Sequence, residues 1–457
     1  MILAFQILGV CGQCTQNARE FKLEFDTIDD VDNLAEKLGA GEVHLSKELT
    51  VIFIAPFGSS SAFRAIPVFA LGSCKKPNEQ LQTAIFEEED GEPASVHIRI
   101  GPLGSMHSDG DAQRRRAFLK IAAGCSFFSE EYLGALVSWA LMDQICGPGG
   151  VVHCFDWKHL VKRLRERLKS ETTGVKIGDG PAITGPGLRQ LAVALDPQRL
   201  ESLFNPADRQ NVHLAVKLLR LVDKIADAPA DSDFVTGLGT NNFPSAMHMD
   251  LLGAIVKPLL AVLFDTKQNV SQQLQGLACL SHILLYLYRK NKTGFIPGQL
   301  YHDLQATIRC AFVTVAQGCH FSPEELLHMF DLGSDNVEQE FAVIRTLTHA
   351  RTCEVKEFAQ RVSHATQLND TWAKRPEWKR AGVRLNKGTA DHMNHTTWAA
   401  GGEGNASVKD VDLVSCWKVG RRNAVRALAA HPTYAGVAVE HFDEFMSEGI
   451  TMFCPVG

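Results

Sequence analysis

The chain is organised around one stretch, Ser334-Asp335-Asn336-Val337-Glu338-Gln339-Glu340-Phe341-Ala342-Val343-Ile344-Arg345. Val337, Phe341 and Ile344 recur with helical spacing, which predicts an amphipathic helix. Ser334 or Asp335 is the predicted N-cap of this helix, because Ser and Asp are both good N-cap residues. Glu338 and Asp335 are three positions apart and share a face beside the apolar stripe. A carboxylate at the edge of a core can point into a cleft, so this position is suited to chemistry.

A second acidic stretch lies far upstream, at His107-Ser108-Asp109-Gly110-Asp111. It ends a short strand-like segment and opens a basic helix containing Arg114-Arg115-Arg116, which places Asp109 at a strand-to-turn junction. Carboxylates from such a turn and from a distant helix can converge on a hard cation through oxygen ligands. We therefore expect folding to bring Asp109 and Glu338 within reach of one divalent ion.

The composition is that of a globular protein. A chain of 457 residues with 45% apolar and 21% charged residues can form two or three domains with substantial cores. The net charge of −6 gives no general attraction to nucleic acid, so such binding depends on local basic clusters. Twelve irregularly spaced cysteines, with no signal peptide, predict an intracellular chain with reduced thiols. The absence of an apolar run of about 18 residues predicts no transmembrane span.

Strands and helices alternate in the first third of the chain. Strands, rich in β-branched and aromatic residues, are predicted at 5–10, 49–54, 66–71, 96–100, 105–108 and 151–155. Helices are predicted at 28–38, 80–88, 112–123, 129–142 and 157–169. This alternation favours an α/β fold, a sheet covered by helices.

The strand signal then disappears. Helical periods at 188–195, 211–227, 249–264 and 271–288 predict a large all-α insertion. Helices at 300–317 and 323–330 lead into the Glu338 helix. The predicted segments are 1–170, the N-terminal part of the core; 171–292, the insertion; 293–400, the C-terminal helical part of the core; and 401–457, a linker and small tail.

This order of segments is how RNase H-like nucleotidyltransferases divide their active site, and several motifs resemble one family of them. The Glu338 stretch resembles the S-Q-D-H-L-E-x-x-F-x-x-x-R signature of P-element-type transposases, the group that includes the THAP-domain transposases. Asp156-Trp157-Lys158-His159-Leu160-Val161-Lys162 is similar to the D-x-P-H-L-L-K step of that family. Thr293-Gly294-Phe295 resembles its T-G-F segment, and Asp109 occupies the place of its second catalytic Asp.

The likeness covers roughly residues 7–420, and its fuller run resembles the fungal transposon-encoded branch. That run continues through Phe204-Asn205-Pro206-Ala207-Asp208-Arg209-Gln210-Asn211-Val212 and Thr293-Gly294-Phe295-Ile296-Pro297-Gly298-Gln299-Leu300-Tyr301. Each motif alone has little specificity, whereas their order and spacing together are moderately specific. The implied fold is an RNase H-like mixed sheet flanked by helices and interrupted by the all-α insertion.

The resemblance also implies a chemistry. In such enzymes two Asp and one Glu hold two divalent ions, Mg²⁺ or Mn²⁺, for in-line attack on a DNA phosphodiester. Asp109 and Glu338 would then be catalytic metal ligands. The residues expected near the DNA are His159, Lys158, Lys162, Arg163, Arg165 and Arg345. DNA is the implied partner, no membrane is involved, the expected location is the nucleus, and a homo-oligomer is one implied state.

One part of the family pattern is missing. Its first catalytic Asp lies on a strand upstream of the segment that Ile7-Leu8-Gly9-Val10-Cys11 resembles, and here the sequence starts at Met1. We therefore expect an N-terminally truncated or decayed transposase, or a gene model without an upstream exon, with an incomplete metal site and impaired activity. Asp26, Asp29 and Asp30 are better interpreted as capping and solvated residues.

Two further ligand motifs are weaker. The insertion of the family can bind GTP, but no G-x-x-x-x-G-K-[ST] loop is present, so Thr236-Gly237-Leu238-Gly239-Thr240 is more simply a glycine-rich turn. Cys11-Gly12-Gln13-Cys14 has zinc-knuckle spacing without a second pair at finger spacing. GTP and zinc are therefore minor predictions.

Three hypotheses follow. The first is a transposase-like enzyme by ancestry, with DNA strand cleavage or transfer impaired. The second is a non-catalytic DNA-binding or assembly protein that retains the same fold. The third is an unrelated helical scaffold, which predicts that Asp109 and Glu338 lie far apart.

Overall fold

The structure is a computed structural model. It describes residues 27–42, 45–56, 65–73, 103–122, 124–137, 139, 141–195, 203–205, 211–228, 248–265, 267–347, 355–378 and 406–455. The elements predicted at 5–10, 80–88 and 96–100 lie outside these ranges. The chain forms two compact units, and each is described by itself. The first comprises Met1–Glu92, Ala112–Ala117 and Ser334–Lys387, and the second comprises Pro93–Asp111, Phe118–Gly333 and Gly388–Gly457.

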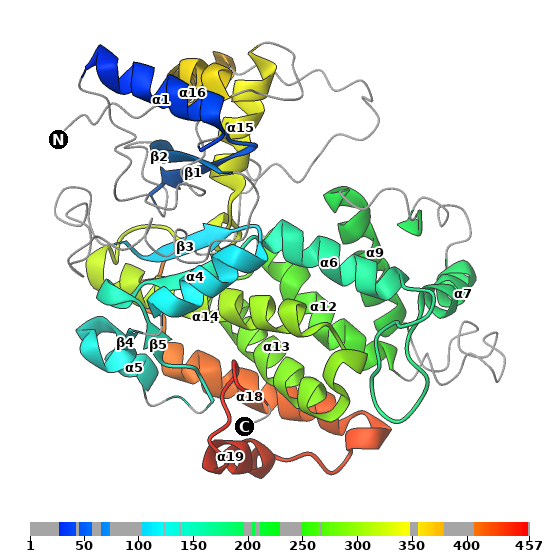
Figure 1. The fold of residues 1–457 in the computed structure, drawn as a ribbon. Helices are drawn as coiled ribbons and strands as arrows, with labels where there is room; N and C mark the ends of the chain where they lie inside the picture. Colours follow the sequence, from blue (N-terminus) through cyan, green and yellow to red (C-terminus); the bar gives the residue numbers. More distant parts are fainter. Residues whose placement is uncertain are drawn as a thin grey trace. The chain divides into compact units, whose positions relative to one another are not determined.

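The first unit combines an antiparallel strand pair with helices. Strand β1 (Glu48–Ile54) pairs antiparallel with β2 (Ile66–Ser73), and helices α15 (Asp335–Thr346) and α16 (Val355–Lys374) belong to the same unit (Figure 1). Their core contains Val343, Ile344, Phe358 and Ala365, with partly buried side chains of β1 and β2 packed against it. Helix α1 (Ile28–Ala40) begins with a capping box at Thr27. Phe341 and Ile344 of the apolar stripe predicted for the Glu338 helix therefore face this core.

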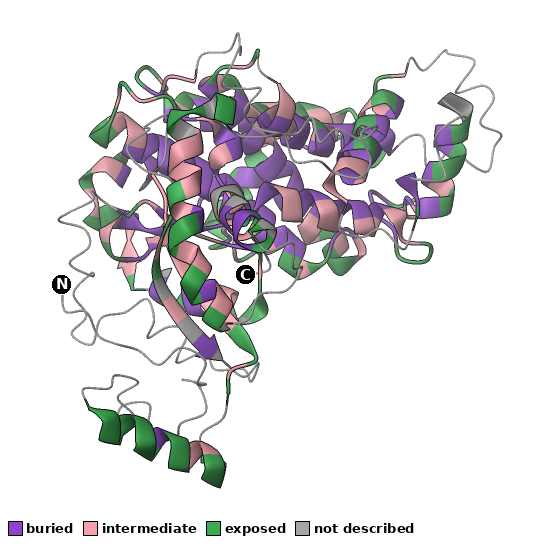
Figure 2. Ribbon diagram, turned by 90° about the horizontal axis from the view of Figure 1, so that it is seen from above, coloured by how far each residue is buried: buried purple, intermediate pink, exposed green. Residues whose placement is uncertain are grey.

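The second unit is mostly helical around a parallel strand pair. Strands β3 (Ser105–Ser108) and β6 (Val152–Phe155) pair in parallel, while β4 (Cys125–Ser126) and β5 (Ile145–Cys146) make a two-residue antiparallel pair. The longer helices are α6 (Trp157–Lys169), α7 (Gly185–Leu195), α9 (Val212–Ala226), α12 (Met249–Phe264), α13 (Val270–Asn291), α14 (Gly298–Phe321), α18 (Leu413–Ala429) and α19 (Val439–Ser447). Helix α4 (Ala112–Ala122) is divided between the units after Ala117. Buried residues run along these packed helices (Figure 2). Helix α14 is buried from Leu300 to Tyr301 and from Asp303 to Gln317, so it is the central helix of the unit.

The threonine at the middle of α14 joins this helix to the strand pair. The Thr307 hydroxyl accepts a hydrogen bond from the Phe155 N–H at 3.1 Å and lies 3.2 Å from the Phe155 carbonyl oxygen. These groups are on the edge of β6, where a backbone donor buried without a partner would be costly. The side chain of α14 thus takes the place of a neighbouring strand.

Most predicted elements are confirmed, including the helices of segment 171–292. Between α6 and α14 the described elements are α7, α9, α12 and α13, with one isolated β-bridge between Val175 and Ile183. The sheet is smaller than predicted. Among the described residues the strands form three separate pairs, and no continuous mixed sheet is found.

Two predicted helices are wrong. Residues 129–142 form 3-10 turns at Phe127–Ser129 and Glu131–Leu133 and the short helix α5 (Gly134–Val137), and Leu141 has a φ of 71°, which a right-handed helix excludes. Residues 323–330 form turns. There the Leu327 N–H donates to the Ala406 carbonyl at 2.9 Å, so pairing with a distant segment replaces helical hydrogen bonds.

The compact units group the segments differently from the predicted boundaries. Helix α18, in the predicted tail 401–457, packs along α13 of the insertion. The predicted segment 293–400 divides between Gly333 and Ser334. Helix α15 thereby groups with β1 and β2 rather than with α14.

The contact between α18 and α13 depends on a glycine. A Cβ at Gly420 would lie 2.3 Å from the Ala278 Cβ and 2.7 Å from the Cys279 backbone nitrogen, whereas a Cβ at Gly276 would meet Pro258 at an ordinary 3.5 Å. We predict that Gly420→Ala lowers the free energy of unfolding by about 2 kcal/mol through overpacking. Gly276→Ala should leave stability unchanged or raise it by up to about 1 kcal/mol, because Ala is the better helix former. Urea unfolding of both variants measures this, and equal effects would contradict the packing.

Candidate functional site

Two carboxylates follow the ends of neighbouring parallel strands. In the register of β3 and β6, Ser108 is opposite Phe155, so Asp109 and Asp156 are the first residues beyond the paired segment. The Asp156 N–H donates to the Ser108 carbonyl oxygen at 3.4 Å, which extends the ladder to this point. Asp109 is exposed, whereas Asp156 is only 2% exposed. Because the strands are parallel, both carboxylates lie at the same edge of the pair.

Asp156 also begins the basic helix. Its Oδ1 accepts a hydrogen bond from the His159 backbone N–H at 3.1 Å, as an N-cap does, and lies 3.3 Å from His159 Nδ1. The His159 side chain stays 27% exposed. A Cβ at Gly333 would lie 2.9 Å from Asp156 Oδ2, so a glycine is required where that segment passes the carboxylate. Asp156 therefore orients the histidine and the start of α6 together. The signal for this position in the sequence is that Asp156 directly follows the strand predicted at 151–155.

The cations of α6 differ in their surroundings. Lys158, Lys162 and Arg163 are half-buried on the helix flank. Arg165 is fully buried, and its Nη2 donates to the Leu203 carbonyl oxygen at 3.0 Å. A guanidinium shielded from solvent has no access to a phosphate, so we leave Arg165 out of the proposed DNA surface. Its role here is to fix α6 to the Leu203 segment.

A further cation of α6 holds one of the motif segments. Arg167 donates to the carbonyl oxygens of Thr293 at 2.8 Å and Gly294 at 2.9 Å. The T-G-F segment is thus a carbonyl-lined turn before α14, held by a guanidinium from the D-x-x-H-L-x-K helix. These two motifs, more than a hundred positions apart, are in direct contact within the second unit.

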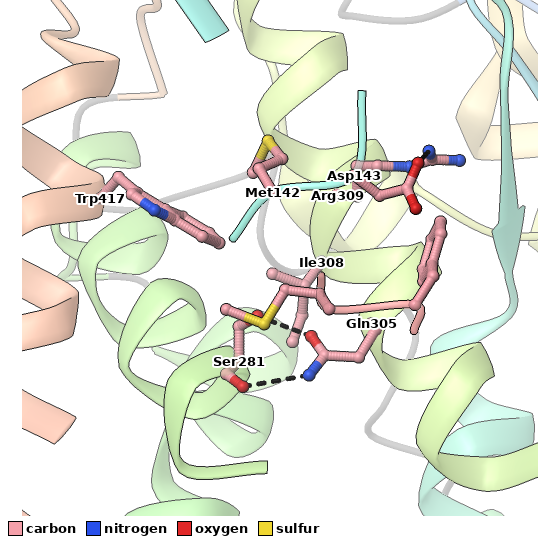
Figure 3. A pocket seen from close by; sticks show the side chains of 9 residues that line it. Met142, Asp143, Ser281, Gln305, Ile308, Arg309 and Trp417 are labelled. Atoms are coloured by element: carbon pink, nitrogen blue, oxygen red, sulfur yellow. Dashed lines mark hydrogen bonds and ion pairs between the residues drawn. The ribbon is translucent and has the colours of Figure 1, made fainter. Parts of the chain in front are cut away.

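A small cavity in the second unit lies among Ser281, Gln305, Arg309 and Asp143 (Figure 3). Its volume of about 10 Å³ matches a single water. The Ser281 hydroxyl donates to Gln305 Oε1 at 2.6 Å on one side, and Arg309 lies 3.6 Å from Asp143 on the other. Most of the polar side chains that line the cavity are therefore engaged with one another, although Arg309 Nε and Nη2 are buried without a hydrogen-bond partner among the described residues.

The Glu338 helix has the predicted start and stripe. Ser334 is its N-cap residue, and the exposed Glu338 lies in its first turns. Phe341 packs edge-on against Phe53 with ring centroids 5.7 Å apart. Arg345 is exposed.

A second glutamate on this helix has a structural role. Glu340 is 1% exposed, accepts a hydrogen bond from the Thr366 hydroxyl at 2.8 Å and is also bonded to the Asn369 amide. It ties α15 to α16. Of these two glutamates, only Glu338 is exposed for chemistry.

Asp109 and Glu338 belong to different compact units. Each has the local setting expected of it, a strand end for Asp109 and an exposed helix face for Glu338. The shared divalent ion therefore stays a prediction. The segments 236–240 and 11–14, predicted as a glycine-rich turn and a weak zinc motif, lie outside the described residues.

Comparisons with known proteins add one structural similarity. No protein-family model matches the sequence, and no curated protein matches it. The structure is similar to the Drosophila P element transposase strand transfer complex, with a TM-score of 0.41, 15% sequence identity, and coverage of 73% of this chain and 71% of that chain. A similarity of this size assigns no role to any residue. Among the described residues, none of the helices is both long and apolar enough to cross a membrane.

The partly exposed Arg163 is paired with the fully buried Asp303 of α14. We predict that Arg163→Ala lowers the free energy of unfolding by about 3 kcal/mol, because removing one partner leaves a buried carboxylate without its cation. Lys162→Ala, one position away on the same helix, should change stability by no more than about 0.5 kcal/mol. Thermal and urea unfolding compare the two. A change of the same size in both variants would show that the Arg163–Asp303 pair is energetically unimportant.

Proposed function

We propose that this protein is a transposase-like nucleotidyltransferase with an RNase H-like core that cleaves or transfers DNA strands with divalent ions. The observation that carries the proposal is the parallel pairing of β3 and β6, which brings Asp109 and Asp156 to one edge and starts the basic helix α6 there. Carboxylates at the ends of parallel strands beside a cationic helix suit metal-dependent chemistry on a phosphodiester. The motif resemblance, in the order Asp109, Asp156, Thr293 and Glu338, supports the same function.

The proposed metal ligands are Asp109 and Glu338. Both offer hard oxygen donors on exposed side chains, the donor type that Mg²⁺ and Mn²⁺ prefer. Bound there, these ions would activate a water or a 3′-hydroxyl and stabilise the leaving oxygen. Asp156, held at the helix start, is a positioning residue that orients His159 toward the same edge.

Chain connectivity supports including Glu338. Gly333 passes directly against Asp156, and α15 begins two residues later. The Glu338 N–H donates to the Ser334 carbonyl at 2.9 Å, so one helical turn, with a rise of about 6 Å, separates those residues. Glu338 is therefore five residues along the chain from the glycine that contacts Asp156.

Lys158, Lys162, His159 and Arg345 form the proposed DNA-contacting set. Arg163 contributes less, because its guanidinium is engaged with Asp303. Nuclear location, self-association and GTP binding stay predictions from the resemblance.

The second candidate function is a non-catalytic DNA-binding protein of the same ancestry. It is favoured by the burial of Asp156 and its use as the N-cap of α6, since this carboxylate then has a structural role. The two functions differ in the role of the Asp109 and Glu338 carboxylates. Only the enzyme requires them for metal-dependent cleavage or transfer of DNA strands.

We predict that Asp109→Asn and Glu338→Gln each reduce Mn²⁺-dependent nicking of a supercoiled plasmid roughly a hundredfold, equivalent to about 3 kcal/mol of lost transition-state stabilisation. Both variants should keep the circular dichroism spectrum and the DNA affinity of the original chain. Glu171→Gln, an exposed acid elsewhere in the second unit, is the matched control and should retain activity.

Nicking that survives in both variants would refute the assigned ligands. An original chain that binds DNA but shows no nicking in Mn²⁺ or Mg²⁺ would favour the non-catalytic function.

The basic helix gives a separate prediction about binding. Replacing Lys158 and Lys162 together with Ala should lower the slope of log affinity against log salt by about 2, since each phosphate contact contributes about 0.9 for duplex DNA. Fluorescence anisotropy with a labelled duplex at several salt concentrations measures the slope. Lys217→Ala, an exposed lysine on α9, is the control. An unchanged slope in the double variant would place the DNA elsewhere.

A further inference from the structure

Three soft metal-ligand side chains meet beneath the strand ends of the second unit. A ring nitrogen of His107, the Cys154 thiol and the Cys310 thiol all lie within 4.8 Å of one another. They come from three elements, β3, β6 and α14. None of them belongs to the site proposed above, and Cys154 and Cys310 are fully buried.

Two contacts of the fold bring these three side chains together: the pairing of β3 with β6 and the packing of α14 against β6. His107 and Cys154 are register partners in the parallel pair, so their side chains point to the same face of it. Cys310 is three residues after Thr307 and therefore shares a face of α14 with the threonine that is bonded to β6. The strand register and the helix contact each fix one part of the trio.

The surroundings suit a thiophilic ion. One imidazole nitrogen and two thiol sulfurs that lie within 4.8 Å of one another are the donor types that Zn²⁺ prefers. Two thiolates would cancel the charge of a divalent ion, which avoids leaving a net charge in the core. The Ser105 hydroxyl lies 2.6 Å from His107 Nε2, the position of an outer-shell partner that orients a ligand.

We propose that His107, Cys154 and Cys310 bind a Zn²⁺ ion that joins β3, β6 and α14. Binding displaces one proton from each thiol, forms two zinc–sulfur bonds and one zinc–nitrogen bond, and involves no oxidation or reduction. Two Cys and one His are common zinc ligands, and a fourth position is left for an additional donor. The role is structural: the ion would fix the two strands whose ends carry Asp109 and Asp156. This inference does not rest on the proposed function.

The test uses the full chain, purified with reductant and without chelator, and its zinc content measured by mass spectrometry. We expect one zinc per chain, and no zinc in Cys310→Ala or Cys154→Ala. Cys416→Ala, which removes another buried cysteine of the second unit, should keep the zinc. The double variant Cys11→Ala/Cys14→Ala should also keep it, which separates this site from the N-terminal pair.

Cobalt substitution tests the ligands without any mutation. The Co²⁺ form of the original chain should show thiolate-to-metal charge-transfer absorption and the strong visible bands of four-coordinate Co²⁺. Ser105→Ala should weaken zinc binding roughly 10–100-fold, as loss of an outer-shell partner does, while leaving the fold intact. A zinc-free original chain without thiolate absorption would overturn the proposal. So would a Cys154–Cys310 disulfide in protein purified without reductant, or equal zinc loss in Cys416→Ala.

Discussion

The parallel register of β3 and β6 is the constraint on which the rest of the second unit depends. Shifting that pairing by one residue would turn every side chain of one strand to the opposite face. It would separate His107 from Cys154 and move Asp109 away from Asp156 along the edge. The pair has only four residues per strand, so its own hydrogen bonds are too few to fix the register. The register is fixed from outside, chiefly by Thr307 of α14, which occupies the open edge of β6.

Polar groups in the interior serve to position the helices. Arg165 on α6 and Asp303 on α14 are fully buried and partnered, and Arg309 donates to the Ile145 carbonyl at 2.8 Å. Such groups add little net stability, because their desolvation offsets much of the attraction between them. Their geometric requirements are strict, however, since a shifted helix would leave a buried charge without a partner. They define where α6 and α14 lie relative to the strands. The positions of the strand ends are fixed in turn by these two helices.

The local sequence pattern was sufficient to predict an element wherever that element packs through a single apolar face. The stripe of the Glu338 helix, the Asn211 cap of α9 and the span of α12 all follow from apolar spacing and capping residues. The same reasoning failed at 129–142, where Leu141 adopts a left-handed conformation that no local pattern signals. It also counted the fully buried Arg165 among the residues expected near the DNA. A run of cations does not show which one points inward, because that depends on the rotation of α6 about its axis.

The cluster of His107, Cys154 and Cys310 could not be predicted from the sequence for a similar reason. His107 and Cys154 could be paired from sequence only by knowing the strand register, and Cys310 only by knowing how α14 is rotated. Once these are fixed, the second unit has an exposed oxygen donor, Asp109, at a strand end and two buried sulfur donors, Cys154 and Cys310. Hard ions such as Mg²⁺ and thiophilic ions such as Zn²⁺ select between those donor types. Because the donors share no atom, loss of a buried ion would be expressed first in stability. Loss of a strand-end ion would be expressed in chemistry alone, so the two roles are separable even though the same two strands support both.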